Sequence, residues 1–201
     1  MYEIGIFGMP DEKFSKEVTF WKNRFKDEFG YQLYLDHIPH MTFCNFFVKD
    51  KFEIISELEK FCVVRDEVLN IKIKNTDCFK KDPITNMITP FFVINKNSEL
   101  LKFQEELINQ INNLIETKFK NKFGSKIYEE NNKKRKYPFI GKSWIPHITV
   151  GSINQKHFNN PLMKSFLKYN INYHFPLESI SIYEISNTKQ KEIANVNFNV
   201  R

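Results

Sequence analysis

The 201-residue sequence has almost no alanine, little glycine and no long apolar run. No segment approaches the roughly 20 apolar residues of a membrane-spanning helix, which excludes an integral membrane protein of that kind. The first residues lack the basic-then-apolar layout of a signal peptide. The three cysteines are an odd, widely spaced set within apolar segments, which favours reduced core residues over a disulfide frame or a zinc site. We therefore expect a cytoplasmic protein with no membrane partner.

The amino-acid usage is also uneven. There is a single alanine, and 26 lysines stand against four arginines, which folding does not require. Such usage is typical of AT-rich codons and indicates a low-GC genome, such as that of a firmicute, a phage, a large DNA virus or a protist. A content of 41% hydrophobic and 15% aromatic residues is nevertheless too rich in core formers for a disordered chain.

The net charge of +6 is concentrated in one stretch. Residues 117–144 hold nine basic and two acidic side chains, a balance of +7 that exceeds the charge of the whole chain. We predict an irregular basic loop over 120–143, which contains two glycines and a proline. Such a loop would draw a short anionic partner by local steering. Its Lys-Lys-Arg-Lys cluster at 133–136 also has the form of a nuclear localisation signal, and that alternative stays open.

Apolar periodicity predicts alternating strands and helices. Helices are predicted after the capping residues Asp11, Asp50 and Ser98, and again over 159–169. Strands are predicted over 2–8, 40–48, 68–75, 86–95, 145–153, 177–186 and 192–200. Pro90, inside one of these strands, favours an edge or a bulge. Strands with antiparallel pairing and helices to one side make an α+β protein.

An internal repeat is the most informative feature of the sequence. Ile-Pro-His-Met-Thr-Phe at 38–43 reappears as Ile-Pro-His-Ile-Thr-Val at 145–150, and both copies open an apolar strand. Residues i and i+2 share a face of a strand, so His40 lies beside Thr42 and His147 beside Thr149. Two such strands related by a pseudo-twofold axis would set two imidazoles and two hydroxyls around one cavity.

Two imidazoles and two hydroxyls suit the chemistry of a phosphodiester. One histidine takes a proton from the attacking hydroxyl and the other gives one to the leaving oxygen, while the threonine hydroxyls stabilise charge on the phosphate oxygens. A single His-x-Thr arises by chance and is then an ordinary core or surface pair, whereas two copies in matching six-residue contexts favour function. The sequence has neither a Gly-rich phosphate loop nor a zinc spacing, and we expect no metal and no cofactor.

On these two motifs the chain resembles the 2H phosphoesterase superfamily, which is named for its paired His-x-Thr/Ser motifs. That superfamily includes bacterial RNA 2′,5′-ligase-like proteins, cyclic phosphodiesterases and 2′,5′-oligoadenylate phosphodiesterases. The resemblance covers most of the chain and implies one bilobal domain over 1–201, with two pseudo-symmetric antiparallel-type sheets and outer helices around a central cleft. It assigns the catalytic roles to His40, Thr42, His147 and Thr149, and which histidine is the acid depends on substrate orientation. The second histidine follows the first by 107 positions, a long separation for the family.

Residues near the motifs are further candidates. Trp144 could stack on a base, with core packing as the alternative, and Tyr137 and Lys142 at the end of the basic loop could reach base and phosphate. His37 precedes His40 by three residues, but this spacing is poor evidence for a metal on a strand. A surface or supporting place is favoured for it.

The sequence thus predicts a metal-independent phosphodiesterase for 2′-5′-linked nucleotides, such as 2′,5′-oligoadenylate or a cyclic dinucleotide like 2′,3′-cGAMP. A role in viral evasion of nucleotide-based immune signalling rests on the resemblance and the inferred origin alone. One alternative is RNA processing, by opening 2′,3′-cyclic phosphates or by 2′-5′ ligation. Another is a non-catalytic RNA-binding module that uses the basic loop. We expect a monomer that needs no protein partner and binds a small nucleotide or short RNA.

Overall fold

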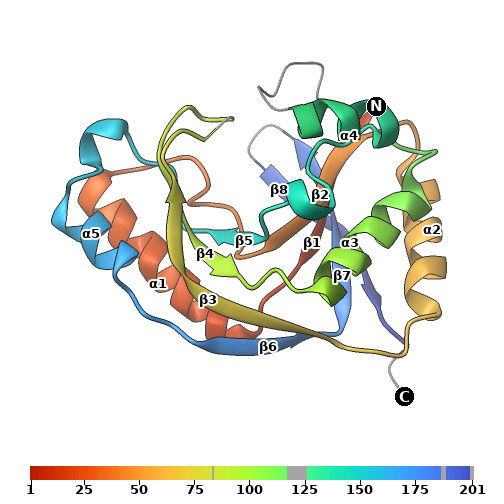
Figure 1. Cartoon of the computed structure of the whole chain (residues 1–201), viewed down its shortest axis with the longest axis horizontal. Coiled ribbons are helices and arrows are strands. Elements are labelled where there is room, and N and C mark those ends of the chain that lie inside the picture. The colour runs from red at the N-terminus through yellow and green to blue at the C-terminus, as the bar shows by residue number, and fades with distance from the viewer. Residues whose placement is uncertain (83, 117–125, 187–188, 200–201) are drawn as a thin grey trace.

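A computed structural model describes residues 1–82, 84–116, 126–186 and 189–199 (Figure 1). Within these ranges eight strands form one curled antiparallel sheet in the order β6-β3-β4-β5-β2-β1-β7-β8. The strands are β1 Tyr2–Gly8, β2 Met41–Val48, β3 Leu69–Phe79, β4 Thr89–Ile94, β5 His147–Thr149, β6 Tyr173–Leu177, β7 Ser179–Ser186 and β8 Lys189–Asn197. The predicted α+β class is confirmed.

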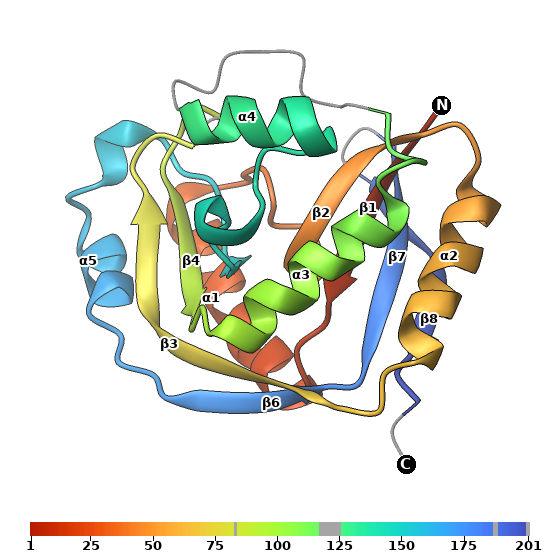
Figure 2. The ribbon, with the colours of Figure 1, turned by 45° about the vertical axis from the view of Figure 1, so that its right-hand side comes forward.

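Helices cover both ends of the sheet. They are α1 Glu12–Phe29, α2 Lys51–Val63, α3 Ser98–Ile111, α4 Lys126–Arg135 and α5 Pro161–Leu167, with short 3₁₀ turns η1 Gly141–Ser143 and η2 Gln155–His157. Helices α1 and α5 lie beside β3, β4 and β6, whereas α2 and α3 lie at the other end of the molecule (Figures 1 and 2). In the part of the chain that the structure describes, no helix is both long and apolar enough to cross a bilayer.

The two ends exchange helices. Helix α1 follows β1, yet its Phe14 ring packs on Phe92 of β4 and Phe175 of β6 at the opposite end of the sheet. Helix α3 follows β4, yet its Phe103 ring packs on Phe43 of β2 and on Phe198. Each half of the sheet is therefore covered by a helix whose strand belongs to the other half. This exchange interlocks the two halves and leaves the central strands β2 and β5 between them.

Local sequence explains where α1 begins and ends, as predicted. The Asp11 carboxylate accepts a hydrogen bond from the backbone N–H of Phe14 at 2.8 Å and so satisfies one free donor of the first turn. The helix ends before Gly30, whose φ of 75° lies in the left-handed region that glycine adopts without strain. Helix α2 is capped by Asp50 as predicted, whereas α3 is capped by Asn97 and not by the neighbouring Ser98.

The predicted basic loop is in part a helix. Residues 117–125 lie outside the described residues, but Lys126–Arg135 form α4. No residue of α4 is buried, so the sequence offers no apolar periodicity to reveal it. Its charges explain the helix instead, since Glu129 lies in the first turn and Lys133, Lys134 and Arg135 in the last, which complements the helix dipole.

Other boundaries differ from the prediction near the centre of the sheet. Strand β5 spans only His147–Thr149 instead of 145–153, α5 is shorter than 159–169, and β6 was not predicted. Pro90 lies in the interior strand β4, neither at an edge of the sheet nor at a bulge. Its carbonyl accepts from Val150 N just beyond the end of β5, so the N–H that proline lacks would have faced the same place, where β5 has already ended.

The two predicted sheets are joined into one. A single residue pair, Met41 with Ile148, connects β2 to β5, and both side chains are fully buried. The pseudo-symmetry of the prediction is kept, because β1 and β7 follow β2 on one side while β4 and β3 follow β5 on the other.

Gln104 of α3 ties this centre to the segment before the second motif. Its side chain is fully buried, its amide donates to the carbonyls of Phe43 at 3.0 Å and Phe139 at 2.8 Å, and its oxygen accepts from Gly141 N at 3.1 Å.

We predict that Gln104→Ala lowers the free energy of unfolding by roughly 2–4 kcal/mol, because three buried backbone groups lose their partners. Urea denaturation measures the loss. Gln110→Ala on the same helix is the control, since Gln110 bonds Glu57 at the surface and should change the stability little. Equal effects of the two substitutions would contradict this account.

Candidate active site

The pair Met41 with Ile148 brings the two His-x-Thr motifs together. Because side chains alternate along a strand and these two point into the core, the residues on either side of them point to the opposite face of the sheet. These residues are His40, Thr42, His147 and Thr149. Continuing the antiparallel register by one residue sets each histidine opposite the threonine of the other motif. The four predicted catalytic residues therefore lie together on one face of the central strands.

The neighbouring strands frame this face in the same way on both sides. Phe7 of β1 pairs with Thr42, and its ring stacks on His40 with 3.9 Å between centroids. Phe91 of β4 pairs with Thr149, and its ring lies 4.8 Å from that of His147. Each imidazole thus has an aromatic wall from the adjacent strand, which restricts its rotation.

A backbone carbonyl fixes the tautomer of each imidazole. Nδ1 of His40 lies 2.7 Å from the carbonyl oxygen of Ile38, and Nδ1 of His147 lies 2.7 Å from that of Ile145. A carbonyl oxygen only accepts, so Nδ1 must carry the proton in both rings. Nε2 is therefore the atom that gains or loses a proton, which both an acid and a base at a reacting oxygen require.

The surroundings of the two imidazoles differ in charge. The pKa of His40 is lowered to about 3, chiefly by burial and also by the nearby His37, Lys22 and His147, while the Ile38 carbonyl acts to raise it. Burial also lowers the pKa of His147, but there the Ile145 carbonyl and the Asp82 carboxylate both act to raise it. His40 therefore has the cationic Lys22 as a neighbour, whereas His147 has the anionic Asp82.

Asp82 was not identified from the sequence. Its buried carboxylate accepts from Thr89 Oγ1 at 2.8 Å and from the backbone N–H groups of Ile84 and Thr85 at 2.7 and 3.2 Å. Asp-Pro at this position reads as a turn signal, and nothing in the sequence places the turn near His147.

Lys22 was not predicted from the sequence either, although its position in the helical pattern could have revealed it. It lies four residues after Val18 on the buried face of α1, where a lysine is out of pattern.

The three predicted substrate contacts lie in different surroundings. Trp144 is 4% exposed, packs on Phe43 and donates from Nε1 to the carbonyl of Thr42 at 3.1 Å. Tyr137 is 3% exposed. This burial speaks against contact of either ring with a substrate and favours the core-packing alternative for Trp144. Lys142 is exposed. His37 lies beside the site, with its ring centroid 6.3 Å from that of His40, which fits a supporting place.

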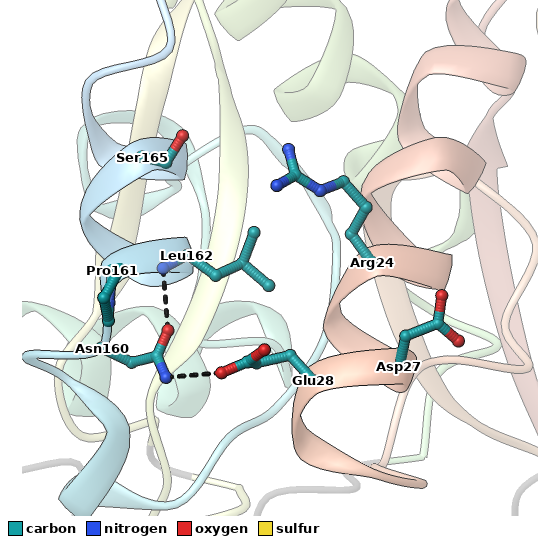
Figure 3. Close-up of a pocket in the computed structure, with 7 residues that line it drawn as sticks. All are labelled: Arg24, Asp27, Glu28, Asn160, Pro161, Leu162 and Ser165. Atoms are coloured by element: carbon teal, nitrogen blue, oxygen red, sulfur yellow. Dashed lines mark hydrogen bonds between the residues drawn. The ribbon is translucent and has the colours of Figure 1, made fainter.

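Two concavities of the surface differ in their relation to the motifs. One of about 660 Å³ lies between α1 and α5 on the outside of the molecule (Figure 3) and is lined by Arg24, Asp27, Glu28, Asn160, Pro161, Leu162 and Ser165. It contains no motif residue, so its size does not make it the active site. The other, of about 190 Å³, adjoins the His40 side and is lined by Tyr31, Leu33, Tyr34, Asp36, His37, Ile84 and Thr85.

A comparison with known protein families places the paired motifs in one superfamily. The model of the 2′-5′ RNA ligase superfamily matches residues 10–189. The chain belongs to this superfamily. The resemblance to 2H phosphoesterases is thereby confirmed, and the family supports an enzyme of the 2H type. No curated protein matches the sequence significantly.

Solved structures share the fold along the whole chain. The protein TT0787 of Thermus thermophilus is 11% identical, with 99% of each chain covered and a TM-score of 0.64. E. coli LigT complexed with 3′-AMP is 10% identical, with 98% of each chain covered and a TM-score of 0.60. LigT complexed with NADP+ is 9% identical, with 98% of each chain covered and a TM-score of 0.55. Identities this low establish the fold alone.

We predict that His40 stays neutral from pH 7 down to about pH 4, because burial lowers its pKa to about 3. The protonated form becomes the major one only below that pKa, so the ring signals of His40 should be constant across this range. NMR titration of the imidazole signals, assigned with His40→Gln, measures this. A midpoint near the ordinary histidine value of about 6.5 would contradict the prediction.

Proposed function

We propose that the protein is a metal-independent phosphodiesterase for 2′-5′-linked nucleotides. One observation carries the proposal: two imidazoles, each presenting Nε2, and two threonine hydroxyls lie on one face of two adjacent strands. This set provides a base, an acid and two hydrogen-bond donors for a phosphate, all from the chain itself.

The cleavage follows from the position of the neighbouring hydroxyl. In a 2′-5′ linkage the free 3′-hydroxyl attacks the phosphorus while the bond from phosphorus to the leaving 5′-oxygen breaks. One imidazole takes the proton of the 3′-hydroxyl and the other gives a proton to the 5′-oxygen. The products are a 2′,3′-cyclic phosphate and a 5′-hydroxyl. Hydrogen bonds from Thr42 and Thr149 stabilise the charge on the two remaining phosphate oxygens.

The charges around the histidines support a division of labour. Burial and the nearby Lys22 ammonium favour the neutral form of His40, which suits the general base. Asp82 favours the protonated form of His147, which suits the general acid. A bound phosphate adds negative charge between the rings and raises the pKa of both, which brings them closer to working pH.

Several substrates fit this chemistry. The structures of LigT with 3′-AMP and NADP+ support a nucleotide ligand. A 2′,5′-oligoadenylate or a cyclic dinucleotide such as 2′,3′-cGAMP, cleaved by a virus to escape immune signalling, is the most specific hypothesis and rests on the AT-rich composition and the family. The RNA ligase family name favours RNA processing at 2′,3′-cyclic phosphates or 2′-5′ junctions as the alternative.

We predict that the protein cleaves 2′-5′-linked but not 3′-5′-linked diadenylate, with turnover unchanged by EDTA. His40→Ala and His147→Ala should each lower kcat by about 10²–10⁴-fold, because each removes one proton transfer. Liquid chromatography of the products measures both rates, and RNA ending in a 2′,3′-cyclic phosphate tests the processing alternative. His174→Ala, on the exposed face of β6, is the control.

Equal turnover of the two linkages, or loss of activity in EDTA, would contradict this mechanism. If both histidine variants bind RNA as the wild type does and none of the proteins turns over any substrate, the non-catalytic binding module is the better account.

We also predict that α4 attracts the substrate. Asn131 of α4 donates to the carbonyl of Pro138 and to Ser143 Oγ, both at 3.0 Å, so the helix is tied to the segment that leads into the second motif. Changing Lys133, Lys134 and Arg135 together to Gln should lower kcat/KM by about tenfold at low salt, and the difference should vanish near 1 M salt, since screening removes steering.

Stopped assays over a range of salt concentrations measure this effect. The control carries the same change of charge at the exposed Lys156, Lys164 and Lys168. An unchanged salt dependence in the α4 variant would leave the helix without a part in substrate attraction.

A further inference from the structure

Lys22 is a buried lysine whose ammonium donates its hydrogen bonds to backbone carbonyls. The residue is 5% exposed, and Nζ donates to the carbonyl oxygens of Tyr34 at 2.7 Å, Leu35 at 3.4 Å and His37. An ammonium has three donors, so its capacity is fully used by the segment that leads into the first motif. Asp36 is the acidic group that acts on Lys22.

This segment would not hold its shape alone. Tyr34 has a φ of 74°, a conformation that is strained for a residue with a side chain and persists only where surrounding contacts enforce it. The carbonyl of His37, which Lys22 binds, is followed directly by that of Ile38, which fixes Nδ1 of His40. Lys22 therefore acts one peptide unit away from the contact that orients the imidazole.

The second motif has a corresponding lysine from a different element. Lys96, between β4 and α3, donates from Nζ to the carbonyls of Lys142 at 2.8 Å and Trp144 at 2.9 Å. When the two motifs are aligned, these carbonyls correspond to those of Leu35 and His37. In both halves, a lysine therefore binds the carbonyls three and five residues before the catalytic histidine.

The equivalent positions of the carbonyls that Lys22 and Lys96 bind indicate that the two lysines have a functional role. A buried ammonium is costly, and burial lowers the pKa of Lys22 to about 8. An apolar side chain would fill the space more cheaply if packing were the only need. Two lysines that reach equivalent carbonyls from non-equivalent elements indicate that each motif requires its approach segment to be held.

We propose that Lys22 and Lys96 are positioning residues, each of which holds the approach segment of one catalytic histidine so that Nε2 points at the phosphate. This inference rests on the proposed roles of His40 and His147. Neither lysine needs to touch the substrate. Lys22 is the stronger of the two because it is buried, whereas Lys96 is exposed and its charge is screened by water.

Lys22 should act on His40 through its charge as well as through its hydrogen bonds. The charged groups that act on His40 are His37 in its own segment, Lys22 from α1 and His147 from β5. Removing the ammonium leaves the two histidines and so favours protonation of His40. The acidic limb of the kcat/KM profile should then move to higher pH, a shift that loss of packing alone would not cause.

The test compares Lys22→Met with Lys26→Met, an exposed lysine one turn further along α1. Lys22→Met should lower kcat by about 10²-fold with KM within about threefold, because a catalytic group is displaced while substrate contacts remain. The His40 ring signals in NMR should shift, and their midpoint should rise. Lys96→Met should lower kcat by about tenfold, and Lys26→Met should change neither quantity.

The outcomes separate this proposal from the proposed function. If the wild type cleaves no phosphodiester, the proposed function fails, while the His40 signals still test the coupling to Lys22. If the wild type is active and Lys22→Met keeps both its kcat within twofold and its His40 signals, the positioning role is overturned. Should Lys22→Met not fold, Lys22→Gln replaces it. The His40 signals of the wild type are then also followed while Lys22 titrates near pH 8. Unchanged His40 signals in both measurements would overturn the proposal.

Discussion

The single residue pair between β2 and β5 is the constraint on which the site depends. Met41 and Ile148 are the one point where the two halves of the described sheet share a ladder, and their burial fixes which face of each strand turns inward. A slip of one residue in either strand would turn the imidazole of that strand into the core and its apolar side chain to the opposite face. The exchanged helices α1 and α3 protect this register, because each packs on the half of the sheet that its own strand does not belong to. The catalytic geometry is thus a consequence of core packing at the centre of the molecule.

The repeat extends beyond the six residues that reveal it. In both halves the carbonyl two residues before the histidine binds Nδ1, and the carbonyls three and five residues before it bind a lysine. Every residue has a backbone carbonyl, so this part of the repeat cannot be recognised from the sequence. The repeated feature is the placement of carbonyl acceptors, which bind the catalytic-motif histidine in each half and a lysine from a different element. A sequence alignment of the two halves would match His40 with His147 and would miss the lysines, since Lys22 lies inside a helix and Lys96 precedes one.

The sequence alone therefore predicts the local part of this protein and little of its long-range part. The cap at Asp11 and the end of α1 at Gly30 depend on residues within a few positions of one another, and these two predictions are confirmed. The motifs are equally local. Trp144 illustrates the limit, because only the packing of β2 and its bond to the Thr42 carbonyl decide between core and substrate. Asp82 reaches His147 through the fold and not through the chain. Helix α4 was mistaken for a loop because charges that complement the helix dipole, and not an apolar face, define it.

A symmetric scaffold gives no direction to a reaction whose attacking and leaving oxygens differ. The strands, the aromatic walls and the carbonyls that fix the tautomers are equivalent in the two halves, so none of them distinguishes an acid from a base. The difference must come from charges outside the repeat. Lys22 is buried beside the first motif whereas its counterpart Lys96 is open to solvent. Asp82 is buried near the second motif, whereas Asp36, which acts on Lys22 beside the first, is exposed. A cation on one side and an anion on the other bias where a proton resides, and in the proposed reaction that bias would orient the attacking hydroxyl toward His40 and the leaving oxygen toward His147. In that proposal the motifs supply the chemistry, and unrepeated buried charges supply its direction.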